Sequence, residues 1–245
     1  MRLFFETNDL DQTKLRLTPD RFHYLSRVRR LQQGESLSVI IGHTCYTIKV
    51  LQIDPDYLYF ESLSHAKINS ASLLDITVIQ CLPKQDKMDT IVNYCTQLGV
   101  SNIYPIESQR SIVKWPQHKK DKKRDRWTLI SRHASEQSHQ LSQVAVHPIQ
   151  SLSSFCTSFK ADRHTSCIVP WESEISLSLK EHLSQMVPLQ CSSIALFIGP
   201  EGGISIDEIM QLRELGFITI SLGDAIYRTE IAALITLSQL NFYFS

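Results

Sequence analysis

The sequence predicts an α/β protein, in which a parallel β-sheet covered by helices on both faces follows a small strand-rich module. From residue 75 onward, continuously apolar runs alternate with helical segments, as expected for buried parallel strands. Before residue 70, short apolar runs follow one another with turn residues between them. The polar stretch 66–72 separates the two patterns, so we expect domains over 1–70 and 74–245.

The first module is expected to be a small barrel with one helix. In R-F-H-Y-L-S-R-V-R-R-L (21–31), apolar residues recur every three positions, which indicates a helix that ends before Gly34. Strand-like runs follow at 36–42, 45–53 and 57–63. One helix with two or three short strands is typical of a small barrel.

The second region reads as alternating strands and helices. Expected strands are 75–81, 102–106, 165–170, 194–198 and 217–222. Expected helices are 88–98, 119–138, 175–186, 205–216 and 229–240. S-I-D-E at 205–208 has the spacing of a capping box, and Gly99 has the place of a C-terminal cap. The helix at 229–240 is apolar on most sides and is expected to be buried.

Composition indicates an ordinary globular protein, with 42% hydrophobic and 20% charged residues. No apolar run approaches the roughly 20 residues that span a bilayer. Glu6 and Asp9 interrupt the N-terminal stretch, which is unlike a signal peptide, so we expect a cytoplasmic protein. The six cysteines form no C-x-x-C pair, so we expect free thiols and neither a zinc ribbon nor a redox dithiol.

Charge is unevenly distributed although the formal net charge is zero. Residues 76–132 carry a basic excess, and residues 133–245 carry an acidic one. A basic block suggests a polyanionic partner. Much of the excess lies in K-K-D-K-K-R-D-R (119–126), and a run of this kind is more often a solvated helix face.

Three expected strands end in unusual loops, at 168–172, 198–203 and 221–230. Ligands of α/β sheets bind at the carboxyl ends of strands. The second loop, I-G-P-E-G-G, holds three glycines, which let a backbone approach a small planar ligand closely. A tight strand-to-helix turn is the alternative, and it explains one or two of these glycines.

Common catalytic motifs are absent from the sequence. It contains no G-x-x-x-x-G-K-[ST], no G-x-G-x-x-G, no G-x-S-x-G and no H-E-x-x-H. His133 and His139 lie six positions apart on one expected helix and do not share a face, so we expect no metal site.

The stretches I-G-P-E-G-G-I-S-x-x-E and L-G-x-x-I-x-R-T-E-x-A-A resemble the C-terminal signature of the RsmE family, bacterial 16S rRNA (uracil-N3) methyltransferases of the SPOUT superfamily. P-K-Q-D-K-M-D, S-Q-R-S-I-V-K, S-E-Q-S and H-Y-L-S-R-V-R-R-L-Q-Q-G-E are also similar to family motifs, in the same order. The resemblance covers nearly the whole chain.

The resemblance implies a PUA-like RNA-binding β-barrel followed by a SPOUT domain with a deep C-terminal trefoil knot, an exception to the rule that chains do not thread. It implies S-adenosyl-L-methionine as cofactor, a homodimer, and N3 of a uridine in 16S rRNA of the 30S subunit as target. No metal and no membrane are implied.

The resemblance also implies site residues. Those expected at the cofactor are Val169, Pro170, Ile198, Gly199, Pro200, Glu201, Gly202, Gly203, Leu222, Gly223, Ile226, Tyr227, Arg228, Thr229 and Ala232. Those expected at RNA are Arg27, Arg29, Arg30, Lys84, Lys87, Arg110 and Lys114, each of which alone also reads as a solvated surface charge.

Catalysis is expected to involve three of the charged residues. Arg228 would stabilise charge on the uracil oxygens, and Glu230 or Glu201 would accept the proton. Alternatively, Glu230 is a carboxylate favoured by the helix dipole, and Glu201 forms a salt bridge that shapes its loop.

The sequence departs from the family pattern near this site. Ala225 stands where the family usually has Arg, Ile231 where it has Thr, and His139-Gln140 where it has Gly-Arg. These changes leave open a protein of the same fold that binds RNA without catalysis. A SPOUT enzyme with another RNA target, such as a ribose hydroxyl, is a third hypothesis.

Overall fold

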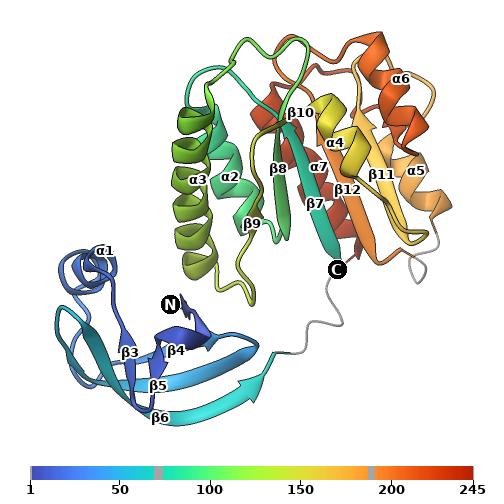
Figure 1. Cartoon of the computed structure of the whole chain (residues 1–245). Coiled ribbons are helices and arrows are strands. Elements are labelled where there is room, and N and C mark those ends of the chain that lie inside the picture. The colour runs from blue at the N-terminus through green and yellow to red at the C-terminus, as the bar shows by residue number, and fades with distance from the viewer. Residues whose placement is uncertain (1, 69–73, 187–190, 245) are drawn as a thin grey trace. The chain divides into compact units, whose positions relative to one another are not determined.

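The computed structural model of the 245-residue chain describes residues 2–68, 74–186 and 191–244. The chain forms two compact units, each with its own core (Figure 1). Unit 1 comprises Met1–Ser72 and Ser135–Gln143, and unit 2 comprises Leu73–Ala134 and Val144–Ser245. The domain boundary expected between residues 70 and 74 lies outside the described residues.

Unit 1 contains a six-stranded mixed sheet in the order β1-β4-β5-β6-β3-β2. Its strands are β1 (Arg2–Phe5), β2 (Leu10–Asp11), β3 (Lys14–Arg16), β4 (Ser36–Ile41), β5 (Thr44–Ile53) and β6 (Tyr57–Lys67). Strands β1 and β4 are parallel, and the other pairs are antiparallel. The core of the unit includes Leu15, Leu25 and Leu58.

The barrel-like module expected here is confirmed as a curled half-barrel, with β1 and β2 at the edges of its sheet. The expected helix needs correction. The predicted helix over 21–31 is a short helix, α1 (Pro19–His23), followed by one turn of π-helix over Tyr24–Val28. Strands β1, β2 and β3 precede it and were not predicted, because two to four residues are too short to show a period-two pattern.

Unit 2 contains a parallel sheet, as predicted, in the order β10-β8-β7-β12-β11-β13, with β9 also paired to β8. Its strands are β7 (Asp75–Cys81), β8 (Asn102–Glu107), β9 (Ala145–Val146), β10 (Gln150–Ser151), β11 (Thr165–Pro170), β12 (Ser193–Ile198) and β13 (Ile218–Ile220). All five predicted strands are present, and only the two-residue strands β9 and β10 were missed.

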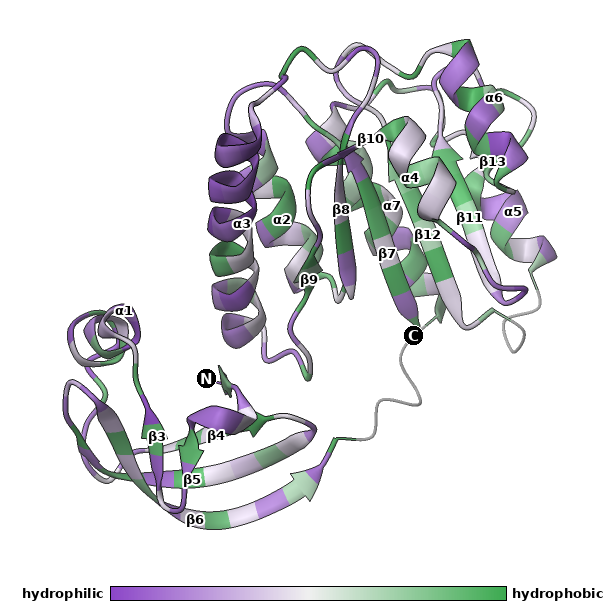
Figure 2. Cartoon of the chain, viewed as in Figure 1, coloured by the Kyte–Doolittle hydropathy of each residue, from purple (hydrophilic) through white to green (hydrophobic). Residues whose placement is uncertain are grey.

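Helices cover both faces of this sheet, also as predicted. They are α2 (Lys87–Gln97), α3 (Gln117–Gln137), α4 (Leu152–Ser158), α5 (Leu179–Gln185), α6 (Ile206–Glu214) and α7 (Thr229–Phe244). Val78 faces the core shared with α2, α5 and α7, whereas its neighbour Ile79 faces the core shared with α4 and α6. Figure 2 shows that β7 and β12 are apolar along most of their length.

Helix α5 begins at Leu179, four residues later than predicted. Ser178 is its N-cap, and a capping box joins the Ser178 side chain to the backbone N–H of Glu181 and the Glu181 carboxylate to the backbone N–H of Ser178. The residues before Ser178 therefore remain a loop, and this loop lies beside the pocket described next.

Candidate functional site

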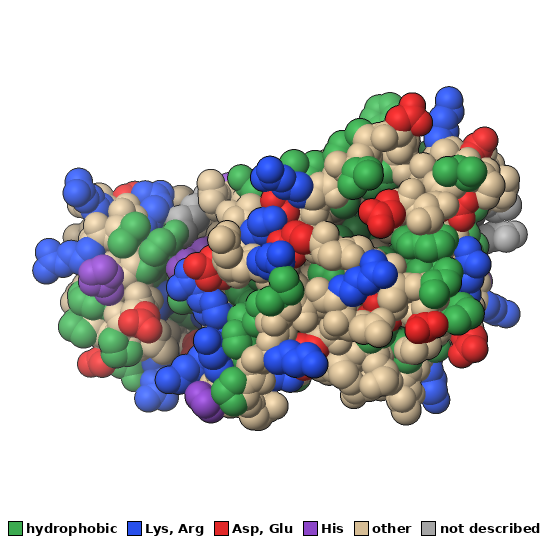
Figure 3. All heavy atoms as spheres, turned by 90° about the horizontal axis from the view of Figure 1, so that it is seen from above, with side chains coloured by type: hydrophobic (Ala, Val, Ile, Leu, Met, Phe, Trp, Pro, Cys, Tyr) green, Lys and Arg blue, Asp and Glu red, His purple; other side chains and the backbone are tan. Residues whose placement is uncertain are grey.

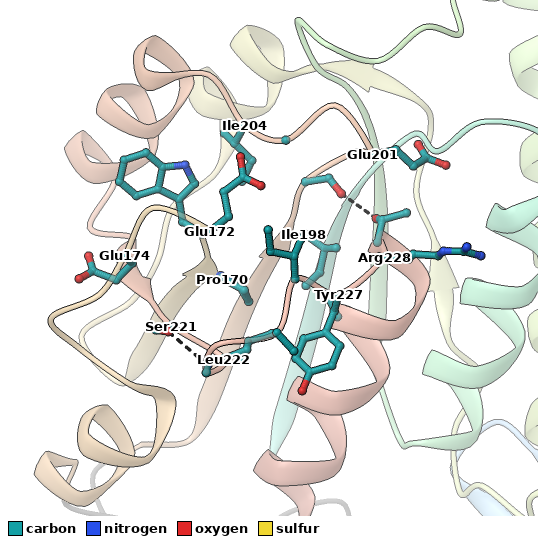
Figure 4. A pocket seen from close by; sticks show the side chains of 18 of the residues that line it. Pro170, Glu172, Glu174, Ile198, Glu201, Ile204, Ser221, Leu222, Tyr227 and Arg228 are labelled. Carbon is teal, nitrogen blue, oxygen red and sulfur yellow. Dashed lines mark hydrogen bonds between the residues drawn. The ribbon is translucent and has the colours of Figure 1, made fainter.

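A pocket of about 600 Å³ lies at the carboxyl ends of β11, β12 and β13 (Figure 4). Three loops line it, and they are the three that the sequence singled out at strand ends. Of the residues expected at the cofactor, thirteen line this pocket: Pro170, Ile198, Gly199, Pro200, Glu201, Gly203, Leu222, Gly223, Ile226, Tyr227, Arg228, Thr229 and Ala232.

Two residues expected at the cofactor lie elsewhere. Val169 is fully buried within β11, in the core on the α4 and α6 face of the sheet. Gly202 packs against Arg110: a β-carbon placed at Gly202 would lie 3.2 Å from Arg110 Cβ. Neither residue lines the pocket.

The glycine-rich turn has two positions where a side chain is disfavoured. A β-carbon at Gly199 would lie 2.6 Å from Ile204 Cγ1, which is closer than packed atoms approach. Gly203 has a φ of +72°, a left-handed conformation that favours glycine. The turn is closed by a hydrogen bond from the Gly203 N–H to the Pro200 carbonyl at 2.9 Å.

A buried polar chain fixes this turn to helix α7. The Thr229 hydroxyl donates to the Gly199 carbonyl at 2.6 Å, and Gln80 Nε2 donates to Thr229 Oγ1 at 2.8 Å. Gln80 is fully buried at the end of β7. Gln80 was not among the predicted site residues, although a single polar residue near the end of an apolar strand is a sequence signal of a site.

Lys87 joins the glycine turn to the start of α7 through two carboxylates. Its Nζ lies 3.0 Å from Glu201 Oε1 and 3.3 Å from Glu230 Oε2. The hydrogen bond to Glu201 raises the pKa of Lys87. Burial raises the pKa of Glu201, but hydrogen bonds from Lys87 and from the backbone N–H of Lys84 outweigh it and leave that pKa below its usual value. Glu201 is therefore a weak base in this arrangement.

The loop between β11 and α5 is held by Glu174. Its carboxylate accepts hydrogen bonds from the Ser176 hydroxyl and backbone N–H and from the Thr219 hydroxyl, and these lower its pKa to about 2. The end of the loop pairs with the residue after β13, since Ser221 N–H donates to the Leu177 carbonyl at 2.8 Å. The trefoil knot itself stays a prediction of the family resemblance.

Arg228 reaches the pocket edge with its backbone but directs its guanidinium elsewhere. The side chain is exposed, and Figure 4 shows it pointing away from Pro170 and Ile198. This orientation leaves the guanidinium available to a molecule outside the pocket.

Several pocket residues were not predicted: Trp171, Glu172, Glu174, Ile175, Ile204, Ser221, Asp224 and Ala225. All of them flank predicted residues within the same three loops, so loop membership was the signal that could have found them.

The basic residues expected at RNA in unit 2 have different surroundings. Arg110 donates from Nη1 to the Gly202 carbonyl at 3.0 Å, and Lys87 is ion-paired, so both support the pocket loops. Lys84 and Lys114 are exposed. On α3, several basic side chains are neutralised by carboxylates: Lys120 by Glu107, Lys123 by Asp86 and Arg126 by Asp89. Figure 3 shows Lys and Arg interspersed with carboxylates on one face.

In unit 1, Arg27, Arg29 and Arg30 are exposed around the end of the π-helical turn. Arg29 pairs with Glu35 at 3.3 Å, and Arg30 adopts a left-handed φ of +53° that ends the turn. His139, one of the departures from the family pattern, also has a positive φ, of +58°.

Neither a metal-binding cluster nor a membrane-spanning helix is present in the described ranges 2–68, 74–186 and 191–244. No group of three or more His, Cys, Asp or Glu side chains there is arranged to hold a metal ion. No helix in those ranges has the length and apolar character needed to cross a membrane.

Comparison with known proteins identifies relatives over the whole chain. The RNA methyltransferase domain family matches residues 70–241. The ribosomal RNA small subunit methyltransferase E of Aquifex aeolicus is 32% identical over 87% of this chain and 88% of its own. The Bacillus subtilis protein of that name is 28% identical over 92% and 89%.

Solved structures agree in fold. A putative methyltransferase from Legionella pneumophila, in complex with the bound cofactor SAM, has a TM-score of 0.84 at 28% identity, covering 98% of this chain and 96% of its own. The ribosomal RNA small subunit methyltransferase E of Neisseria gonorrhoeae has a TM-score of 0.83 at 24% identity, with coverage of 98% and 96%. These comparisons show that the chain belongs to the ribosomal RNA small subunit methyltransferase E (RsmE) family and carries its SPOUT-type methyltransferase fold.

Proposed function

We propose that this protein transfers a methyl group from S-adenosylmethionine to N3 of a uridine in 16S rRNA, within the assembled 30S subunit. The observation that carries the proposal is the pocket built from the two glycine-bearing loops, in a chain of this family. In this proposal residues 1–70 bind RNA and residues 74–245 carry out the transfer. An rRNA substrate implies activity in the cytoplasm.

The pocket fits the cofactor in size and in backbone access. A volume of about 600 Å³ lies within the range of small-molecule sites. Gly199 and Gly203 line the pocket, and a β-carbon at either would lie close to a neighbouring side chain. Leu222 and Ile226 also line the pocket and offer apolar surface for the adenine ring. The Legionella relative, whose structure contains SAM, supports the same assignment.

The reaction sets three tasks for the protein. The bound cofactor supplies an electrophilic methyl group attached to a sulfonium. The N3–H proton of uracil must leave, the new N3–CH₃ bond forms, and S-adenosylhomocysteine is released. The chain must therefore orient the uracil, accept one proton and stabilise charge on the uracil oxygens.

Arg228 is the group best placed for charge stabilisation. It is exposed, it extends from the rim of the pocket, and its guanidinium offers paired donors to a planar anion. Both candidate proton acceptors contact Lys87, but Glu201 lies closer, at 3.0 Å against 3.3 Å for Glu230, and its pKa is lowered by hydrogen bonds. Glu230 is therefore the proposed acceptor, directly or through water.

RNA contacts are proposed for the exposed arginines of unit 1, Arg27, Arg29 and Arg30, and for Lys84 and Lys114 of unit 2. Phosphate contacts position a nucleic acid without specifying its sequence, and they make affinity strongly dependent on salt. Lys87 and Arg110 have a different proposed role, since both hold the pocket loops.

The proposal includes a homodimer. Helix α7 is apolar on most sides, yet it leaves Ile231 and Phe242 exposed, and Tyr94 of the adjacent α2 is exposed as well. Exposed apolar side chains on packed helices are typical of an interface. Light scattering at micromolar concentration should give twice the chain mass of 28.1 kDa, and a monomer would contradict this part.

The departures from the family pattern favour a second candidate. Ala225 lies in the pocket wall without the arginine that the family usually has there. A protein that retains the RNA surface without catalysis would show this change. The same loss also leaves the third hypothesis, another RNA target, to be tested.

One set of measurements separates these functions. S-adenosylmethionine binding is measured first, followed by methyl transfer to undermethylated 30S subunits and to naked 16S rRNA, with mass spectrometry of the nucleosides. The proposal predicts 3-methyluridine in the subunits and little in the naked RNA. Arg228→Ala should abolish transfer while cofactor affinity and the unfolding temperature stay unchanged. Binding without transfer would identify the second candidate, and another methylated nucleoside would reveal a different target.

A further inference from the structure

Opposite charges flank Gly203 at one end of the pocket. A β-carbon at Gly203 would lie 3.2 Å from Glu172 Oε1 and 3.6 Å from Arg110 Nη1. The carboxylate and the guanidinium therefore approach the same glycine from two different loops. They do not pair with each other, since no N···O distance between them is within 4.0 Å.

Glu172 is also available for a ligand, unlike the other glutamates of the pocket. Glu174 is held by Ser176 and Thr219, and Glu201 is held by Lys87. Within the described part of the chain, Glu172 has no ion pair or side-chain hydrogen bond. An exposed, unpaired carboxylate in a pocket wall attracts a cationic group.

Apolar side chains line the pocket away from Glu172, among them Ile198 and Leu222. Figure 4 shows Leu222 and Tyr227 apart from Glu172, on the loop that follows β13. A ligand with one flat, weakly polar end and one charged end therefore fits this pocket in one direction, with its charged end at Glu172.

S-adenosylmethionine is a ligand of this kind, with an adenine ring at one end and an amino acid at the other. We propose that Glu172 binds the α-ammonium group of the methionine end of the cofactor, an inference that rests on the proposed function. The missing side chain of Gly203 leaves room for the ammonium to reach Oε1. Arg110, on the other side of the same glycine, donates to the Gly202 carbonyl and does not line the pocket, so its role stays with the loop.

The test compares three ligands that share the adenosyl group and the sulfur atom and differ in the cationic groups they carry; methylthioadenosine also lacks the whole amino-acid chain. S-adenosylmethionine has the ammonium and the sulfonium, S-adenosylhomocysteine has the ammonium only, and methylthioadenosine has neither. Affinities are measured by calorimetry on the full chain for the wild type, for Glu172→Gln and for the control Asp224→Asn. Asp224 is a matched control, because it is the other exposed carboxylate that lines the pocket without a partner among the described residues.

Glu172→Gln should weaken S-adenosylmethionine and S-adenosylhomocysteine equally, by roughly three- to tenfold, and leave methylthioadenosine within about twofold. Asp224→Asn should keep the ratio of the three affinities unchanged. A loss for S-adenosylmethionine alone would assign the carboxylate to the sulfonium and overturn the inference. An equal loss for all three ligands would show that Glu172 only shapes the pocket, and unchanged affinities would show no contact. A wild-type chain that bound none of the three would instead reject the proposed function.

Discussion

Replacing Gly199 with alanine tests whether the glycine turn is fixed by close packing. The new β-carbon would lie 2.6 Å from Ile204 Cγ1 and 3.2 Å from Ile204 Cδ1. Ile204 is buried, so relieving the contact would require its side chain to leave its packing and shift toward the pocket that it lines. Gly199 also accepts the Thr229 hydrogen bond, and a shift of its backbone would lengthen that bond. Because the φ of Gly199 is not in the left-handed region, the cost is steric and not conformational.

Overpacking of this size costs about 1–3 kcal/mol in the free energy of unfolding. Urea unfolding of Gly199→Ala should show a lower midpoint at an unchanged slope. Calorimetry should show at least tenfold weaker S-adenosylmethionine binding, which corresponds to about 1.4 kcal/mol. The lost affinity is expected because the turn and Thr229 both line the pocket.

A double-mutant cycle identifies the cause. Ile204→Ala alone should cost about 2–5 kcal/mol, but combined with Gly199→Ala it removes the clash, so the double mutant should be more stable than the sum predicts. Gly216→Ala is the control: Gly216 has a φ of +87°, and a β-carbon added there would have no atom within 4 Å, so the cost is backbone strain that Ile204→Ala cannot relieve. Strict additivity at Gly199 and Ile204, or a Gly199→Ala variant as stable as the wild type, would refute the steric argument.

Two further predictions concern charges. Arg21→Met should lower the free energy of unfolding by about 3–5 kcal/mol, because it removes the guanidinium that lies 3.1 Å from the buried Glu136 carboxylate of the same unit. In urea unfolding, the double variant Arg21→Met/Glu136→Met should recover most of this loss. An equal loss in the single and the double variant would contradict the reasoning. Hydrogen bonds from Ser176 and Thr219 hold the pKa of Glu174 at about 2, below the ordinary 4.5. The stability of the wild type relative to Glu174→Gln should therefore be constant above about pH 4.5 and shrink as the pH falls toward 2, and a difference independent of pH would contradict the assigned hydrogen bonds.

Periodicity was sufficient to predict the parallel sheet but not every strand of the half-barrel. Strands β7 and β12 are buried on both faces, so most of their residues are apolar and their limits are sharp. The strands β1, β2 and β3 have too few residues to show alternation. Helix α5 was predicted to start too early because the hydrogen bonds of Glu174, which hold the preceding loop, involve a residue far away in the sequence, Thr219.

The site shows the same division between local and distant information. The glycines of the turn stand close together in the sequence, so the turn could be predicted from the sequence alone. The role of Lys87 could not be predicted from the sequence, because its two carboxylate partners lie more than a hundred positions away. A lysine that follows a strand is equally typical of a phosphate ligand. Arg110 was assigned to RNA for the same reason, and its bond to Gly202 appears only in three dimensions.

The two ion pairs that Lys87 forms with Glu201 and Glu230 have a consequence for how the chain folds as it is synthesised. They join segments from the start, the middle and the end of the sheet domain, and α7 follows every strand of that sheet in the sequence. A nascent chain that has completed all its strands still lacks Thr229 and Glu230, so the glycine turn has neither its hydroxyl donor nor its ionic anchor. Competence to hold a nucleoside ligand should thus arise in a single late step, when the final helix docks.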